Sequence, residues 1–304
     1  MSRIDPVSGR PRADAEVRYT EIPVRDPELA PYVTRFYALQ STDRADPRRD
    51  GWTLSSRHPL MTRLLPNADA NLLFDLGARH LPDRALILGP MEHPLPTTFT
   101  YGLDLFGVAF SIGIPAGFLG ATARDLANRL VPLRELWDGI DSRACLALSR
   151  TQDMNERARR LERLLRARLS RSHIGSARTP ADRLSTLGLD GVLARIAAEH
   201  GNVRVASLAR ADGVSRQHFT RRFKREVGVG PKTYARIVRF QTVLGAMSSA
   251  PRWAELAADL GYFDQAHLIT EFRDWVGVSP ARLHRTFAEL GTPPNARDQS
   301  PARS

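Results

Sequence analysis

Apolar positions along the chain follow two different spacings. Between residues 17 and 140, short apolar runs end at Gly, Pro or Asn, as in RLLPNADANLLFDLG, RALILGP and FTYGLDLFGVAFSIGIPAG. Such runs are typical of strands in an antiparallel barrel or sandwich. From residue 186 to residue 290, apolar residues recur every three or four positions with almost no strand signal, which indicates consecutive short helices. The pattern predicts an α+β protein with a mainly-β N-terminal domain and an all-α C-terminal domain.

Helical spacing also occurs between these two regions. The segment TARDLANRLVPLRELWDGI has Leu126, Leu130 and Leu133 near the spacing of one helix face, so it predicts a helix over residues 122–140. The later segment DMNERARRLERLLRARLSR begins with Asp153 and Glu156, which have the spacing of a capping box.

One apolar stripe runs along the arginine-rich helix that this later segment predicts. It consists of Leu161, Leu164, Leu165 and Leu169. Either the stripe packs the helix onto its own domain, or it mediates dimerisation or a contact between domains. The polar segment SHIGSARTPADRLS that follows is the best candidate for a linker.

The helical region contains one sequence pattern twice. The segments LARADGVSRQHFTRRFKREVGVGP and LAADLGYFDQAHLITEFRDWVGVSP align with Ser215 over Asp264, 49 residues apart. The glycines before them, Gly213 and Gly261, are 48 residues apart, so the second turn is one residue longer.

Each copy has the parts of a helix-turn-helix unit. In the first copy, Val205, Leu208 and Ala209 supply a short apolar helix that permits close packing. Gly213 permits the positive φ of a sharp turn, and Ser215 is suited to cap the next helix.

The helix after each turn has an apolar face and a polar face. Phe219 and Phe223 face inward in the first copy, and Leu268, Phe272 and Val276 do so in the second. The outward residues of the first copy are Arg216, Gln217, Thr220, Arg221 and Lys224, with Arg225 beside them. Those of the second copy are Gln265, Ala266, Ile269, Thr270 and Arg273, with Glu271 and Asp274 toward the flank.

The outward residues suit DNA. Arg and Gln form paired hydrogen bonds with guanine and adenine edges in the major groove, and Lys224 and Arg225 suit phosphates. A solvated helix face would also be polar, but two copies with matched turns, caps and core aromatics favour DNA binding. We expect the first helix to supply most of the base discrimination and charge. The second helix is expected to add apolar contacts with DNA or to dock on the DNA backbone.

The segment between the copies, PKTYARIVRFQTVLGAMSS, predicts one amphipathic helix. A rigid helix here would fix the separation of the two units. Successive major-groove segments recur about every 34 Å along one face of DNA, so one chain would address both.

Charge supports the same partner. The net charge of +11 and the pI near 10.7 favour nucleic acid or an acidic membrane surface. The region 215–239 concentrates this charge, with eight basic residues against the single acid Glu226.

Because no run approaches the roughly 18 apolar residues of a spanning helix, and the N-terminus lacks a secretory core, we expect a cytoplasmic protein without a membrane partner. Cys145 is the only cysteine, which excludes an intrachain disulfide.

Residues 186–290 resemble the DNA-binding domain of AraC-family (AraC/XylS-type) transcriptional regulators. The motifs are GVSRQHFTRRFK, GVGPKTYARIVRF and LAADLGYFDQAHLITEFRDWVGVSPARLHR. The resemblance implies a seven-helix domain with two helix-turn-helix units that binds double-stranded DNA. It also implies activation or repression of transcription, with RNA polymerase as a further partner. By position, the family's base contacts fall on Gln217, Thr220, Arg221, Ala266, His267 and Thr270. Ala266 has no hydrogen-bonding group, so it departs from direct base readout.

The N-terminal half resembles the sensor domains of a subset of these regulators, which are similar to cupin-like barrels. The motifs are LAPYVTRFYAL, RLLPNADANLLFDLG, LILGP and GVAFSIGIPAGFLG; FSIGIPAG departs from the Phe-x-Pro-Gly stretch of relatives. A small-molecule effector is therefore expected in the barrel. Candidate lining residues, each also compatible with an ordinary core, are Phe74, Phe99, Tyr101, Phe106 and Phe110.

Other classes of function have less support in the sequence. His58, His80 and His93 are scattered without a His-x-His or close His/Glu cluster, so we expect no metal and no cofactor. No phosphate-binding loop or nucleophile elbow occurs, so we expect no enzyme activity. Two alternatives remain for the N-terminal domain: it only forms a homodimer, or it is a fused enzyme module.

These patterns predict five parts of the chain. They are disordered tails over 1–16 and 291–304, a sensor or dimerisation domain over 17–145, an amphipathic helix and linker over 146–185, and an AraC-type DNA-binding domain over 186–290.

Overall fold

The computed structural model describes most of both predicted domains, whereas the predicted tails and the predicted linker lie outside the described residues. The described residues are 17–41, 63–77, 83–96, 103–114, 116–137, 141–171, 188–247 and 252–290.

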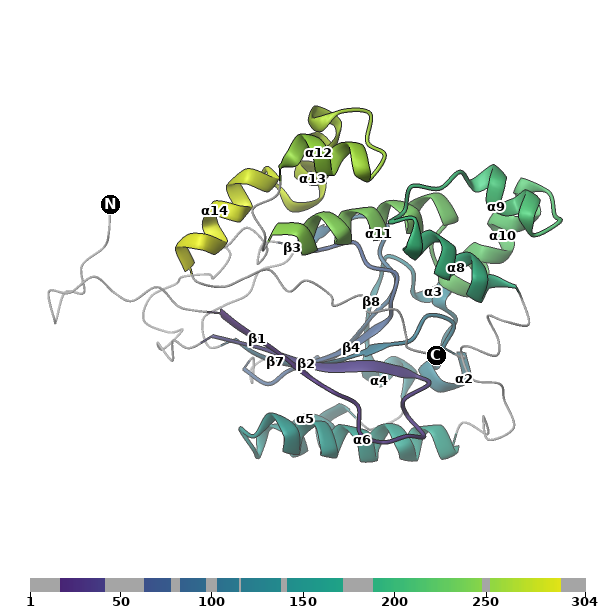
Figure 1. Ribbon diagram of the computed structural model, residues 1–304. Coiled ribbons are helices and arrows are strands. Elements are labelled where there is room, and N and C mark those ends of the chain that lie inside the picture. The colour runs from purple at the N-terminus through teal and green to yellow at the C-terminus, as the bar shows by residue number, and fades with distance from the viewer. Residues whose placement is uncertain are drawn as a thin grey trace, which may run out of the picture.

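Six strands of the N-terminal part form one antiparallel sheet (Figure 1). They are β1 (Val17–Ile22), β2 (Val33–Ser41), β4 (Asn71–Asp75), β5 (Ala85–Leu88), β7 (Asp104–Phe110) and β8 (Leu130–Pro132). Their order across the sheet is β1-β2-β7-β4-β5-β8, and every neighbouring pair is antiparallel. Two short strands, β3 (Arg63–Leu64) and β6 (Leu95–Pro96), pair with each other. The predicted apolar runs are confirmed as β4, β5 and β7.

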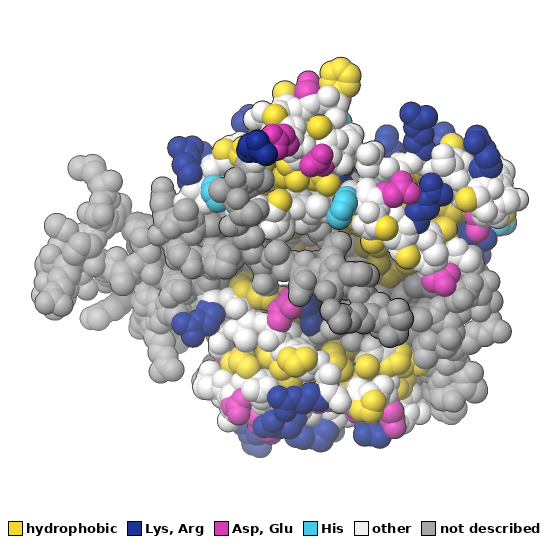
Figure 2. Space-filling model, in the orientation of Figure 1, with side chains coloured by type: hydrophobic (Ala, Val, Ile, Leu, Met, Phe, Trp, Pro, Cys, Tyr) yellow, Lys and Arg dark blue, Asp and Glu magenta, His cyan; other side chains and the backbone are white. Residues whose placement is uncertain are grey.

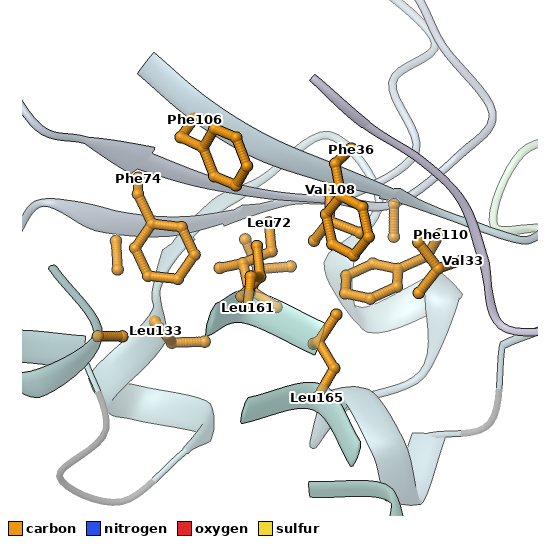
Figure 3. Close-up of a cluster of buried hydrophobic side chains, with 14 of the residues drawn as sticks. Val33, Phe36, Leu72, Phe74, Phe106, Val108, Phe110, Leu133, Leu161 and Leu165 are labelled. Carbon is orange, nitrogen blue, oxygen red and sulfur yellow. The ribbon is translucent and has the colours of Figure 1, made fainter. Parts of the chain in front are cut away.

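One row of apolar side chains crosses the whole six-stranded sheet. The register places Ile22, Phe36, Val108, Leu72, Ile87 and Val131 next to one another, and all are buried. The row faces α6 (Met154–Arg171), whose Leu161 and Leu165 point into it (Figure 3). Together with α5 (Asp141–Ser149), α6 covers one side of the sheet (Figure 1). The leucine stripe therefore packs the helix onto the sheet of its own chain.

Two arginines of α6 bind other elements of the domain, one at Asp104 of β7 and one at Phe118. The Arg157 guanidinium is fully buried and donates to both Asp104 carboxylate oxygens, over 2.6 and 2.8 Å. Arg168 donates from Nε to the Phe118 carbonyl over 2.9 Å, and its guanidinium lies over the Trp137 ring. Of the predicted capping box only one half forms: the Asp153 carboxylate accepts from the backbone N–H groups of Asn155 and Glu156, whereas the Glu156 carboxylate pairs with Arg159 and Arg160.

The single helix predicted over 122–140 is wrong. The segment forms α3 (Ala123–Leu126), then β8, then α4 (Leu133–Leu136), and α2 (Ala116–Leu119) precedes it. Asn128 ends α3 with a left-handed φ of 59°. Val131 then pairs beside Ile87 at the sheet edge. Burial against the sheet outweighs the local helical spacing, which is a weak preference.

Seven helices make up the C-terminal part in the described residues 188–247 and 252–290, as the resemblance implies. They are α8 (Leu189–Ala198), α9 (Val205–Ala211), α10 (Arg216–Val227), α11 (Pro231–Ala246), α12 (Trp253–Asp259), α13 (Gln265–Val276) and α14 (Pro280–Leu290). The predicted connecting helix is confirmed as α11, which joins the α8–α10 group to the α12–α14 group (Figure 1). At 1.5 Å per residue it is about 24 Å long. The predicted fold class, mainly-β followed by all-α, is confirmed.

Candidate nucleic-acid interface

The first helix-turn-helix unit consists of α9 and α10. Gly213 in its turn has a φ of 69°, a conformation that glycine adopts without steric cost. The Ser215 hydroxyl accepts from the backbone N–H of His218 over 3.2 Å and so caps α10. Phe219 and Phe223 are fully buried, with ring centroids 5.9 Å apart. The predicted turn, cap and inward face are confirmed.

The second unit repeats this geometry with α12 and α13. Gly261 has a φ of 68°, and the Asp264 carboxylate accepts from the backbone N–H of His267 over 2.7 Å. Leu268 and Phe272 are buried in the same core as the first unit. The sequence repeat is therefore a structural repeat.

The two capped helices expose the same six positions. On α10 these are Arg216, Gln217, His218, Arg221, Lys224 and Arg225, which we call the α10 face. On α13 they are Gln265, Ala266, His267, Thr270, Arg273 and Asp274, which we call the α13 face. Each residue of the α13 face lies 49 positions after its counterpart. The structure thus brings the predicted DNA-binding residues onto two equivalent surfaces, with the partial exception of Thr220.

Thr220 lies between the α10 face and the core. It is half-buried, and its hydroxyl donates to the Arg216 carbonyl over 2.8 Å. Its counterpart Ile269 is also half-buried. His267 is exposed, but its ring accepts weakly from the Phe263 backbone N–H and packs edge-on against Tyr262, so it also supports the turn.

The two faces differ in charge. The α10 face carries four Arg or Lys side chains and no acid, whereas the α13 face carries one arginine and one aspartate. Figure 2 shows basic side chains gathered over the α9–α10 end of the helical part and over α6. Because phosphate attraction scales with the cations presented, the α10 face is the stronger anion-binding surface.

The sequence predicted Glu271 toward the flank of the outward face of α13, and this prediction is wrong. It is buried, with Arg236 Nε 3.0 Å and Arg239 3.5 Å from its carboxylate. The Tyr262 hydroxyl donates to it as well, and burial together with this carboxylate raises the pKa of the phenol. Two of the eight basic residues in 215–239 therefore neutralise a charge inside the domain instead of facing outward.

Phe263 is a residue that sequence analysis missed. Its side chain is 92% exposed, immediately before the cap of α13. The signal was present in the longer second turn, which places an additional residue between glycine and cap. The ring therefore adds one exposed apolar side chain next to the α13 face.

Comparison with known families agrees with this geometry. Residues 208–295 match the family model described as a helix-turn-helix domain. This part of the chain is an AraC-type helix-turn-helix domain, the domain of a family of transcription regulators. Residues 25–132 match a domain of unknown function (DUF6597), so the AraC-type domain follows a separate N-terminal one. No curated protein matches the chain in sequence.

Solved structures of ToxT from Vibrio cholerae have a distant likeness to this chain. A structure from strain O395 is 9% identical, covers 74% of this chain and 92% of its own, and has a TM-score of 0.40. A structure of unsaturated fatty acid-bound ToxT from strain SCE256 is 12% identical, covers 89% and 94%, and has a TM-score of 0.43. The likeness is distant, so what this chain binds has to follow from its own residues.

The AraC-type domain touches the N-terminal domain through α10. Lys224 Nζ lies 3.5 Å from a carboxylate oxygen of Glu92 in the segment between β5 and β6. At the end of α10, a Cβ on Gly228 would lie 2.8 Å from both the Ala123 carbonyl oxygen and Pro90 Cγ. The backbone of α10 therefore approaches α3 as closely as a glycine permits. A cavity of about 650 Å³ lies beside this contact.

The structure gives the predicted ligand-lining aromatics a packing role. Phe74, Phe106 and Phe110 are fully buried in the sheet core, on the side that faces α6 (Figure 3). Phe99 and Tyr101 lie outside the described residues.

Within the described part of the chain, no three His, Cys, Asp or Glu residues group as metal ligands would. His93 is described, whereas His58 and His80 lie outside. Among the described residues, no helix has the length and apolar character that crossing a membrane requires.

Proposed function

We propose that this protein is a sequence-specific DNA-binding regulator of transcription that places α10 and α13 in successive major-groove segments. The observation that carries the proposal is the repetition of six exposed positions on two helices with equivalent turns and caps. The α11 helix of about 24 Å joins the units and keeps them apart, and successive major-groove segments recur about every 34 Å on one face of DNA.

The two helices have unequal roles in this proposal. Arg221 and Gln217 on the α10 face pair with guanine and adenine edges, and Lys224 and Arg225 bind phosphates. The α13 face is nearly neutral, and it offers Ala266 and the neighbouring Phe263 to thymine methyls and sugars.

The N-terminal domain controls access of α10 to DNA in response to a small molecule. This part of the proposal is supported by the contacts of Glu92, Pro90 and α3 with α10, through which a change in one domain reaches the other. In this proposal, the chain consists of a sensor domain over 17–145, a helix and linker over 146–185 and a DNA-binding domain over 186–290. The alternative, a domain that only dimerises, predicts a stable dimer whose DNA affinity responds to no metabolite.

Two further partners belong to the proposal. A regulator of transcription acts on RNA polymerase, and a second copy of the chain would double the number of bound half-sites. Sedimentation velocity of the full chain distinguishes monomer from homodimer. Action on the chromosome implies the cytoplasmic location that we expected.

The test is DNA binding by the full chain. Genome-wide mapping of bound fragments identifies the operator, and we expect one beside the protein's own gene. Affinity for this fragment should fall steeply with salt, because each phosphate contact adds about 0.9 to the slope of log affinity against log salt. Lys224→Ala should reduce this slope by about one contact. Arg195→Ala, which removes a cation from α8, should leave it unchanged. Salt-insensitive binding, or no bound fragment, would contradict the proposal.

A further inference from the structure

Among the described residues, all the side chains that line the cavity between the two domains are basic. One of them, Arg124, belongs to α3 of the N-terminal domain. The others belong to α10 and are His218, Arg221, Arg222, Lys224 and Arg225. A cavity of about 650 Å³ is within the range of small-molecule sites, which is about 300–1,000 Å³.

Three of the five Arg and Lys side chains in the cavity are already paired. Arg222 pairs with Asp212 of α9's C-cap, Lys224 with Glu92, and Arg225 with Glu226. Within the described residues, Arg124 and Arg221, one from each domain, form no ion pair with a carboxylate, although the charge of Arg124 helps to lower the pKa of its neighbour Asp125. Of the five cations, these two are therefore the ones open to an anion in the cavity.

We propose that this cavity binds the phosphate group of a small phosphorylated molecule, held between Arg124 and Arg221. A phosphate monoester carries a charge of about −1.5 to −2 near neutral pH, which matches the two unpaired guanidinium groups. Guanidinium also binds phosphate through two parallel hydrogen bonds. The remaining volume accommodates the rest of a small metabolite.

Occupation of this site would oppose DNA binding. Arg221 is a base-contacting residue of the α10 face, and it cannot bind a ligand phosphate and a guanine edge together. A phosphate held by Arg124 also ties α10 to the N-terminal domain. By linkage, the ligand lowers DNA affinity by the same factor by which DNA lowers ligand affinity. The inference rests on the proposed function, since it names a ligand class for the control of α10.

The first measurement uses no DNA. Calorimetry of the full chain with inorganic pyrophosphate, at ionic strength balanced with sodium chloride and without divalent cations, should show saturable binding. Arg124→Ala should abolish it, Arg124→Lys should retain part of it, and Arg129→Ala should leave it unchanged. Arg129 is the matched control because it is exposed on the same segment and does not line the cavity.

The second measurement adds labelled operator DNA. Pyrophosphate should lower the affinity of the wild type and of Arg129→Ala by about fivefold or more. It should change that of Arg124→Ala by less than about twofold, with DNA affinity in the absence of pyrophosphate preserved.

Three results would overturn the inference. The first is that the wild type does not bind pyrophosphate. The second is that pyrophosphate lowers the DNA affinity of all variants equally, which would indicate general electrostatic screening. The third is that Arg124→Ala binds DNA weakly even without pyrophosphate, which would mean that Arg124 contacts the DNA backbone. A wild type that binds pyrophosphate but no DNA would instead refute the proposed function.

Discussion

Lys224 on α10 lies 3.5 Å from Glu92 of the N-terminal domain, so one cation of the α10 face is held by a carboxylate before DNA arrives. DNA binding through Lys224 has to break this contact. The pair is partly exposed, with side-chain exposures of 48% and 19%, so its contribution is about 0–1 kcal/mol.

Glu92→Gln should therefore raise operator affinity. The substitution preserves shape and removes the competing charge, and we expect an increase of up to about fivefold at low salt. Fluorescence anisotropy with labelled operator measures it. Glu135→Gln, which removes an exposed carboxylate from α4, controls for net charge. An equal increase in both variants would mean that net charge, not the contact, sets the affinity.

Local sequence was sufficient to predict the two helix-turn-helix units. Gly213, Ser215, Gly261 and Asp264 act within four residues of their own position, through backbone φ and capping, so their roles are visible in the sequence. Because the pattern occurs twice, each copy supported the interpretation of the other as a helix-turn-helix unit. The exposed faces followed from helix periodicity once the inward aromatics were placed.

Interactions between distant segments could not be predicted in the same way. Arg236 and Arg239 looked like part of the basic surface, but their partner Glu271 is more than 30 residues away. The contact of Lys224 with Glu92 joins two domains. Charge along a sequence does not show which cations are neutralised by folding.

The N-terminal sheet illustrates a further limit. Alternation in a strand separates two faces, but it does not show which face a helix will cover. Phe74 and Phe106 were candidates for a ligand pocket, whereas the strand order places them opposite each other in the core. The leucine stripe of α6 was predicted without its partner, because the partner is a row assembled from all six strands.

The ion pair of Arg157 with Asp104 should be asymmetric in its effect on stability. Asp104→Asn leaves a fully buried guanidinium without its counter-charge, and we expect a loss of about 3–5 kcal/mol in the free energy of unfolding. Arg157→Met should cost less, because the Asp104 side chain keeps 20% exposure and a hydrogen bond from Gln40. Guanidinium denaturation measures both values. A larger loss for Arg157→Met would contradict this account of the pair.

Phe263 should contribute to DNA binding and not to stability. Its side chain is 92% exposed, so Phe263→Ala should change the free energy of unfolding by less than about 0.5 kcal/mol. If the ring is buried against DNA, operator affinity should fall by about 1–2 kcal/mol. Phe263→Leu should recover part of the loss because it restores apolar area. Unchanged affinity in both variants would remove Phe263 from the interface.

The unequal charges of the two faces predict unequal effects of equivalent substitutions. Arg221 and Thr270 occupy matching positions 49 residues apart. Arg221→Ala should weaken operator binding by about 1–3 kcal/mol and relax the preference for one base pair, because it removes a paired hydrogen bond to guanine. Thr270→Ala should cost less, since a hydroxyl makes at most a single, less selective contact with a base edge.

Competition with operators substituted at each base pair measures both effects. Arg195→Ala serves as the control for loss of a cation outside the faces. Equal losses for Arg221→Ala and Thr270→Ala would mean that the two helices contribute equally to base recognition. The charge difference between their faces would then orient the protein on the DNA backbone and would not select bases.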